Sequence, residues 1–314
     1  MKKKQIIIFL ILLGISHNLT SQNKNITINI KRNSDNSVDF YYEKKLPGSF
    51  YISIEFTSLS NTYNKKYHTV VKNNSGRLFK LKPINKEQPI NFSYKYSYIQ
   101  GTPNPKVDKL FAYTLPFKKE KGITILESTN LNEVYFGSEK PSNWKSYVID
   151  RTYADTVCSM RKGLVVKIVN EFNTDTLTQY SYKSKMNSIL IEHSDGTFAS
   201  YKGFKKNSFL VKLGQTVYPQ SQLGILDAFN DSTYRLYFHI YYLINNDLNL
   251  KGKVSLKEQK SNNGFLTPYF YTTNGSEQLK HKNDYIIDFN EATFFQEFTK
   301  REKKKYLKNP ENFN

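Results

Sequence analysis

Two neighbouring stretches in the middle of the chain decide the fold: NSILIEHSDGTFASYKGF, residues 187–204, and FLVKLGQTVYPQSQLGIL, residues 209–226. They combine a histidine, an Asp-Gly pair and spaced glycines with many apolar residues. Both lie inside a β-rich region that runs from about residue 111 to about residue 245. The fold prediction is therefore mainly β, with the organising strands in this region.

A third stretch in the same region, TYRLYFHIYYL at residues 233–243, alternates polar and apolar side chains. In a strand, a period of two places Arg235, Tyr237 and His239 on one face and the apolar residues on the other. One interpretation is an ordinary half-exposed strand, since one face of a sheet is often solvated. The other is a polar face that contacts a ligand.

The region before residue 106 predicts a separate β domain. Residues 24–100 contain short alternating runs separated by polar turn clusters such as KLPGS and KNNSG, a pattern typical of a β-sandwich. GTPNPK, residues 101–106, has two prolines and a glycine and indicates a linker. We therefore expect a signal peptide over 1–21, a β-sandwich-like domain over 22–105, a second β domain over 106–289 and a basic helix with its tail over 290–314.

The first residues, MKKKQIIIFLILLGISHNLTSQ, indicate export. Three lysines precede an apolar run that is shorter than the roughly 20 residues of a membrane-spanning helix. We expect an exported protein, periplasmic, secreted or at the cell surface, with no transmembrane segment. The net charge of +19 then favours anionic cell-envelope polymers over nucleic acid as partners, although lysine is also a common solubilising residue.

Two smaller features complete the picture. Cys158 is the only cysteine, so no intrachain disulfide can form, and its apolar surroundings predict a buried structural thiol. From Asn290 onward the sequence predicts a docked helix, with Asn290 as its cap and an apolar face of Phe294, Phe295 and Phe298. The basic run KREKKK, residues 300–305, predicts a solvated helix end, with an anion-binding tail as the alternative.

Taken together, the middle stretches resemble the lysostaphin/LytM-type zinc metallopeptidases of the duplicated hybrid motif superfamily. That family carries N-x-hydrophobic-x-I-x-H-x-D-G-x-x-A-x-Y-x-H-L followed by V-x-x-G-Q-x-V-x-x-G-Q-x-I-G. The positions in register here are Asn187, Ile189, Ile191, His193, Asp195, Gly196, Thr197, Ala199, Tyr201, Phe204, Val211, Gly214, Gln215, Val217 and Gly224. The resemblance covers roughly residues 112–285 and implies an antiparallel β-sheet core.

The residues that would bind zinc depart from the family pattern. The H-x-H strand aligns with Arg235 and Tyr237, and the histidine of Y-x-H aligns with Gly203. Asp150 is the one vestigial metal ligand that the resemblance implies. A hydrolytic zinc takes about three His or carboxylate ligands, and a guanidinium would repel it.

The sequence therefore predicts a catalytically inactive, peptidase-like protein with no cofactor and no catalytic residues, which binds peptidoglycan or regulates a cell-wall hydrolase. The candidate ligand-binding residues are Lys202, Tyr201, His193, Arg235, Tyr237 and His239. One alternative is an active zinc metalloendopeptidase with relocated ligands, drawn from Asp150, His239 and Glu139. A second alternative is a structural or adhesive surface protein.

Overall fold

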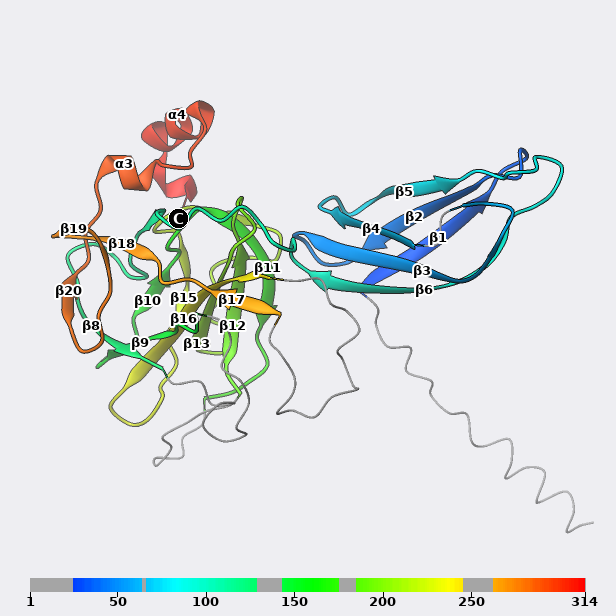
Figure 1. Cartoon of the computed structure of the whole chain (residues 1–314). Helices are drawn as coiled ribbons and strands as arrows, with labels where there is room; N and C mark the ends of the chain where they lie inside the picture. Colours follow the sequence, from blue (N-terminus) through cyan, green and yellow to red (C-terminus); the bar gives the residue numbers. More distant parts are fainter. Residues whose placement is uncertain (1–24, 64–65, 129–142, 175–184, 245–261, 314) are drawn as a thin grey trace, which may run out of the picture.

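The described residues form mainly antiparallel strands with short helices near the C-terminus, which confirms the predicted mainly β fold class. The computed structural model describes residues 25–63, 66–128, 143–174, 185–244 and 262–313. The expected signal peptide and Glu139 lie outside these residues. Figure 1 shows an elongated N-terminal unit beside a rounder second unit, with short helices at one end of the second.

The N-terminal unit is a sandwich of two three-stranded sheets. One has the order β1-β2-β5 and the other β4-β3-β6. The strands are β1 (Ile26–Arg32), β2 (Val38–Lys44), β3 (Phe50–Ser60), β4 (Lys66–Val71), β5 (Ser75–Leu81) and β6 (Asn91–Gln100). Apolar side chains of both sheets, among them Phe40, Ile52 and Ile54, enclose one core.

The second unit is organised by a nine-stranded sheet. Its order is β14-β11-β12-β13-β16-β9-β8-β20, and β17 also pairs with β16. Its strands are β8 (Gly122–Glu127), β9 (Tyr147–Arg151), β11 (Gly163–Val169), β12 (Asn187–Glu192), β13 (Phe198–Phe204), β14 (Thr216–Val217), β16 (Tyr234–Leu243), β17 (Asn263–Phe265) and β20 (Asp284–Ile286).

Two small sheets complete this unit. In one, β10 (Thr156–Cys158) pairs with β15 (Gln222–Ile225); in the other, β18 (Tyr269–Thr272) pairs with β7 (Ala112–Tyr113) and β19 (Gly275–Gln278). Residues from β8, β9, β11, β12, β13 and β16 share a second core. The alternation predicted for β16 is confirmed, because Leu236, Phe238 and Ile240 are buried and the residues between them are not.

The C-terminal region contains two short helices where the sequence analysis expected one. α3 (Glu291–Phe294) is capped by Asn290, and α4 (Lys300–Lys308) is followed by the 3-10 turn η1 (Pro310–Phe313). α4 has a cap of its own: the Thr299 side chain accepts from the Glu302 backbone, and the Glu302 side chain accepts from the Thr299 backbone. This capping box begins a new helix after the turn that ends the first.

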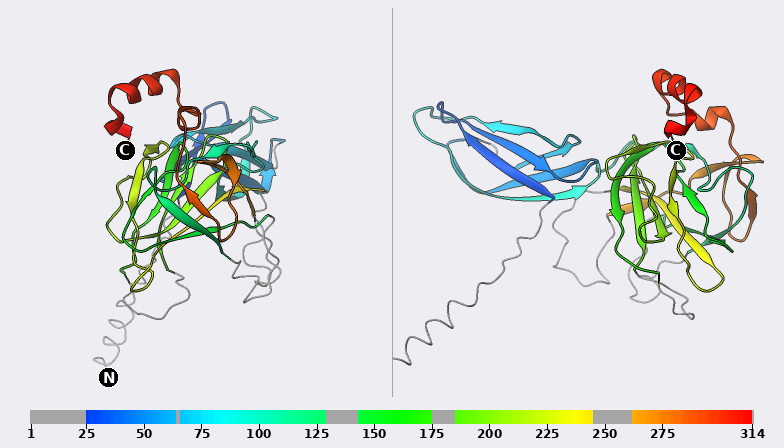
Figure 2. Two further views of the ribbon diagram at one scale, coloured as in Figure 1. Left: turned by 90° about the vertical axis from the view of Figure 1, so that its left-hand side faces the viewer. Right: turned by 180° about the vertical axis from the view of Figure 1, so that it is seen from behind.

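Specific contacts join the two units where β3 begins. Figure 2 shows the second unit at one end of the elongated N-terminal unit. The backbone N–H of Ser49 donates to Glu192 Oε2 at 2.8 Å, and the Ser49 hydroxyl donates to the other carboxylate oxygen. Gly101, with φ +115, lies against the ring of Phe198. The N-terminal unit is therefore in direct contact with the end of β12.

Candidate ligand-binding face

Five polar side chains lie together on one face of the nine-stranded sheet. Arg235 of β16 lies opposite Asp150 of β9, and Tyr237 of β16 lies opposite Lys202 of β13. His239 is two residues further along the same face of β16. Because directly opposed residues in an antiparallel pair point the same way, these five residues form one surface, here called the polar face.

At one end of the polar face Arg235 and Asp150 form a two-pronged ion pair. Arg235 Nε donates to Asp150 Oδ1 at 2.6 Å, and Nη2 donates to Oδ2 at 2.7 Å. The guanidinium also lies 4.1 Å from the ring centre of Phe229. The hydrogen bonds to Asp150 raise the pKa of Arg235. Both oxygens of the carboxylate are thus already bound to a permanent cation.

Lys202 lies beside this pair and has a different character. Its side chain reaches solvent, but the pKa of its ammonium is lowered, first by partial dehydration and then by repulsion from Lys167 of β11. Within the described part of the chain, no acidic side chain forms an ion pair with Lys202. Among the residues that the structure describes, the polar face therefore presents a cation without an acidic counter-charge.

His239 is held among aromatic rings at the other end of the polar face. Its ring centre lies 6.3 Å from that of Trp144, 5.6 Å from Tyr241 and 5.5 Å from Phe265. Burial and the nearby Lys202 lower the pKa of His239 to about 3. The imidazole is therefore neutral at ordinary pH and adds no charge to the face.

The structure does not bring the other two predicted ligand-binding residues to the polar face. Tyr201 points into the core from the opposite side of β13, is fully buried, and accepts a hydrogen bond from the Met160 backbone at 3.0 Å. His193 follows β12 and lies in a separate buried cluster around Arg161.

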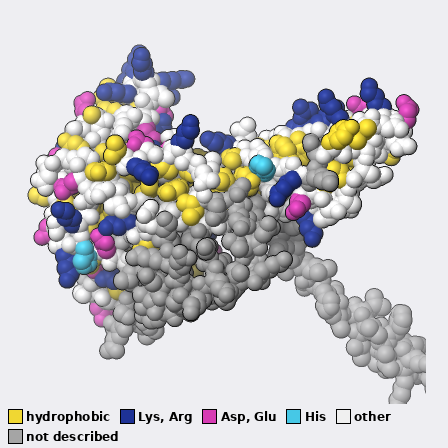
Figure 3. Space-filling model, in the orientation of Figure 1, with side chains coloured by type: hydrophobic (Ala, Val, Ile, Leu, Met, Phe, Trp, Pro, Cys, Tyr) yellow, Lys and Arg dark blue, Asp and Glu magenta, His cyan; other side chains and the backbone are white. Residues whose placement is uncertain are grey.

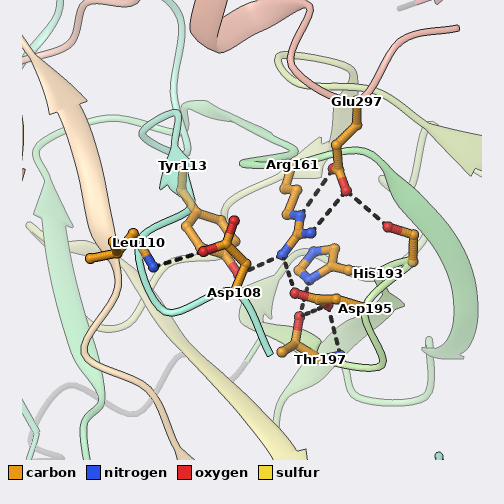
Figure 4. Close-up of polar contacts among 9 residues, drawn as sticks. Asp108, Leu110, Tyr113, Arg161, His193, Asp195, Thr197 and Glu297 are labelled. Atoms are coloured by element: carbon orange, nitrogen blue, oxygen red, sulfur yellow. Dashed lines mark hydrogen bonds and ion pairs between the residues drawn. The ribbon is translucent and has the colours of Figure 1, made fainter. Parts of the chain in front are cut away.

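Arg161 is the centre of that cluster (Figure 4). Its Nε and Nη2 donate to the two oxygens of Glu297 at 2.9 and 2.8 Å, and its Nη1 donates to Asp195 Oδ2 at 2.9 Å. The guanidinium is 3.7 Å from the ring centre of Phe111 and also bonds the Tyr113 hydroxyl. The cluster joins the Asp-Gly turn after β12 to the segment between α3 and α4.

The tautomer of His193 follows from its neighbours. The hydroxyl of Thr197 donates to Asp195 Oδ1 at 2.7 Å, so it accepts from His193 Nδ1 at 2.9 Å. Nδ1 therefore carries the proton, and the buried Nε2 has no hydrogen-bond partner among the residues described. Burial and Arg161 lower the pKa of His193, which keeps the ring neutral.

Sequence reasoning missed Arg161 and Glu297, and no local pattern marks either residue. They are separated by 136 positions in the chain, and only the folded structure joins them. It also missed Lys167, and here strict alternation misleads: it would group Lys167 with buried Val165, whereas a register shift between these two residues places Lys167 opposite Leu190, on the other side of the sheet.

The side chains that are present do not fit a zinc ion at the position that the family resemblance implies. Asp150 is bound to Arg235, which would repel a metal cation. Gly203 has φ +109, and a Cβ added there would lie 2.1 Å from the Arg235 carbonyl oxygen, so this backbone cannot carry a histidine. Across the described ranges, no group of three or more His, Cys, Asp or Glu residues could hold a metal ion.

Comparisons with known proteins place peptidases among the solved structures to which the chain is similar. One is an M23 peptidase from Pseudomonas aeruginosa, with 10% identity over 60% of this chain and 82% of that chain and a TM-score of 0.26. Another is a zinc-containing peptidase from Vibrio cholerae, with 13% identity over 65% of this chain and 74% of that chain and a TM-score of 0.27. No model of a known protein family matches the sequence, and no curated protein matches it.

These neighbours correct one expectation from the sequence. The prediction that the chain is not an enzyme is wrong, because the similar solved structures are themselves named as peptidases. The lack of a metal-binding group among the described residues does not show that the protein is inactive. In the same ranges, no helix has the length and apolar character needed to cross a membrane.

Proposed function

We propose that the polar face binds an anionic, carboxylate-bearing polymer of the cell envelope, with peptidoglycan as the ligand class. The observation that carries the proposal is Lys202, an accessible cation whose pKa is lowered and which has no acidic partner within the described residues. A ligand carboxylate beside it would supply the missing counter-charge through a charge-assisted hydrogen bond.

Tyr237 suits the same class of ligand. It is opposite Lys202 in the sheet register and is partly exposed. Its ring offers an apolar surface with a polar tip, which suits a sugar that has both apolar and hydroxyl-bearing sides. Arg235 has a supporting part, because Asp150 already occupies two of its donors and fixes the position of the guanidinium.

The proposal includes export, which the first 21 residues support by their sequence alone. The full chain has a net charge of +19, and it stays strongly positive without the three lysines of the first 21 residues, which suits polyanions of the cell envelope. A cell-wall hydrolase as a protein partner stays a prediction.

Sedimentation of the protein with purified peptidoglycan tests the proposal. Lys202→Gln should lower the bound fraction about tenfold, because a charge-assisted contact contributes roughly 1.5–3 kcal/mol. Lys95→Gln is the matched control, since Lys95 is also an exposed strand lysine but belongs to β6 of the N-terminal unit. Arg235 is a poor choice for this test, because removing it would leave Asp150 without its partner.

Three readouts decide between the candidate functions. Unchanged binding by Lys202→Gln would count against the polar face, and loss with Lys95→Gln would favour an adhesive role for the N-terminal unit. Release of soluble peptides from the same peptidoglycan, followed by mass spectrometry, would instead show peptidase action. The zinc content of protein purified without added metal would then test the alternative with relocated ligands.

A further inference from the structure

Helix α4 is firmly attached to the second unit through one of its sides. Glu302 accepts from Lys162 Nζ and from the Tyr218 hydroxyl, each at 2.8 Å. Tyr306 packs among the rings of Phe294 and Phe298, at 4.9 and 5.9 Å between ring centres. The capping box at Thr299 fixes where the helix begins. The helix is thus held by its inner side, and its orientation is set by the protein.

The opposite side of α4 is a continuous cationic surface. At 100° per residue, six positions fall within one arc of about 160° that excludes Glu302 and Tyr306. This outer face consists of Lys300, Arg301, Lys304, Lys305, Leu307 and Lys308, all of them exposed. None of its five cations has an acidic partner among the residues that the structure describes. Figure 3 shows the basic side chains gathered on this projection.

Leu307 gives the outer face a second property. Its side chain is 63% exposed, although a leucine in a helix normally faces a core. Spacings of three and seven residues place it on the same side as Lys304 and Lys300. A soluble polyanion would pair with the cations but would offer no apolar surface for the leucine to contact. A bilayer surface accommodates both, with headgroup phosphates near the lysines and the leucine at the acyl boundary.

We propose that the outer face of α4 docks on an anionic membrane surface. This site is separate from the polar face, because it lies on a different element and uses none of the same residues. Binding places the helix axis parallel to the membrane, with phosphate-bearing headgroups beside the lysines and arginine. Since the inner face stays attached to the second unit, the whole domain is held at the membrane in one orientation.

Co-sedimentation of the full chain with vesicles tests this docking. Vesicles of phosphatidylcholine with phosphatidylglycerol should bind the parent, and vesicles of phosphatidylcholine alone should not. The fourfold variant Arg301→Gln, Lys304→Gln, Lys305→Gln, Lys308→Gln should lower the partition coefficient at least about 100-fold, as expected when several interfacial cations are removed. The control variant removes four exposed lysines of the N-terminal unit, Lys66, Lys82, Lys86 and Lys95, and should change the partition coefficient less than threefold.

The leucine separates a membrane from other polyanions. Leu307→Ser should weaken vesicle binding about fivefold, because the leucine side chain leaves water only partly at the acyl boundary and serine lacks its apolar surface, and should leave binding to inorganic polyphosphate unchanged. Equal losses from the α4 variant and the control variant would reduce the effect to net charge and overturn the proposal. Polyphosphate binding with no vesicle binding would overturn it as well. Loss of peptidoglycan binding by Lys202→Gln bears only on the polar face.

Discussion

Arg235 and Asp150 face each other across the β9–β16 pair and share two hydrogen bonds, at 2.6 and 2.7 Å. Because the side chains are 22% and 33% exposed, we expect a coupling energy of only about 1 kcal/mol in a double-mutant cycle of Arg235→Met and Asp150→Asn. The coupling energy is measured by urea unfolding of the variants, with the fluorescence of Trp144, the only tryptophan, as the signal. The more exposed Lys303–Glu291 pair is the control, and additive effects at Arg235 and Asp150 would contradict a functional ion pair.

Gly203 should tolerate no side chain. Its φ is +109, and a Cβ there would lie 2.1 Å from the carbonyl oxygen of Arg235. Gly203→Ala should therefore destabilise the second unit by about 2 kcal/mol or more, since both the clash and the left-handed backbone oppose alanine. Gly122→Ala is the matched control, because Gly122 is also in a strand and has no atom within 4 Å of the added Cβ. Equal unfolding midpoints for the two variants would refute the expected crowding.

Arg161 should be far more sensitive than any surface arginine. Arg161→Met would leave the carboxylates of Asp195 and Glu297 without their cation, and such losses cost roughly 3–5 kcal/mol. Arg161→Lys keeps the charge but cannot fork onto Glu297, so an intermediate loss is expected. The same urea titration measures both variants. A loss below about 1 kcal/mol for Arg161→Met would show that the cluster is not a stabilising network.

Binding of peptidoglycan at the polar face should depend on pH through Lys202. Its pKa is lowered in the free protein, and a bound carboxylate would raise it. Affinity should therefore be constant below the lowered pKa and should fall as pH rises through it, because binding then requires a proton. Sedimentation assays between pH 7 and 10 follow the change. Lys202→Arg, which stays charged throughout this range, should give a flat profile; a profile identical to that of the parent would point to another group.

Cys158 should be unreactive in the folded protein. The thiol is fully buried, and burial raises its pKa to about 11. A thiol reagent such as iodoacetamide should therefore label it at pH 8 only when the protein unfolds, because the thiolate is the reactive form. Labelling in increasing urea, read by mass spectrometry, should follow the Trp144 transition. Rapid labelling without urea would contradict the burial of Cys158.

Alternation and turn chemistry predicted much of the fold. The period-two pattern of residues 233–243 identified β16 and the side on which Arg235, Tyr237 and His239 lie. The structure shows the same local chemistry at Asn274-Gly275, a dipeptide typical of hairpins, which joins β18 to β19 and where Gly275 has φ +94. These predictions succeed because they depend on local backbone geometry and on which side chains avoid water.

Contacts between distant segments could not be predicted in the same way. The resemblance placed Asp150 as a metal ligand, whereas the β9–β16 register places it in an ion pair with Arg235, and a register is a tertiary property. Two predicted residues do not lie on the polar face. His193 is in the turn after β12, and Tyr201 is on the opposite side of β13, so both side chains are buried in the interior. One local signal was overlooked: Thr299 and Glu302 have the capping-box spacing that begins α4.

The hydrogen bonds from Ser49 to Glu192 have a consequence for long ligands. They fix the end of the N-terminal sandwich to β12, a strand within the sheet that carries the polar face. A polymer that touches both units therefore meets two contact surfaces at a set spacing. Once the first contact forms, the second is intramolecular, and its strength depends on effective concentration instead of on the amount of free polymer. Weak contacts on each unit then combine into firm attachment to an extended polymer, but not to its short fragments.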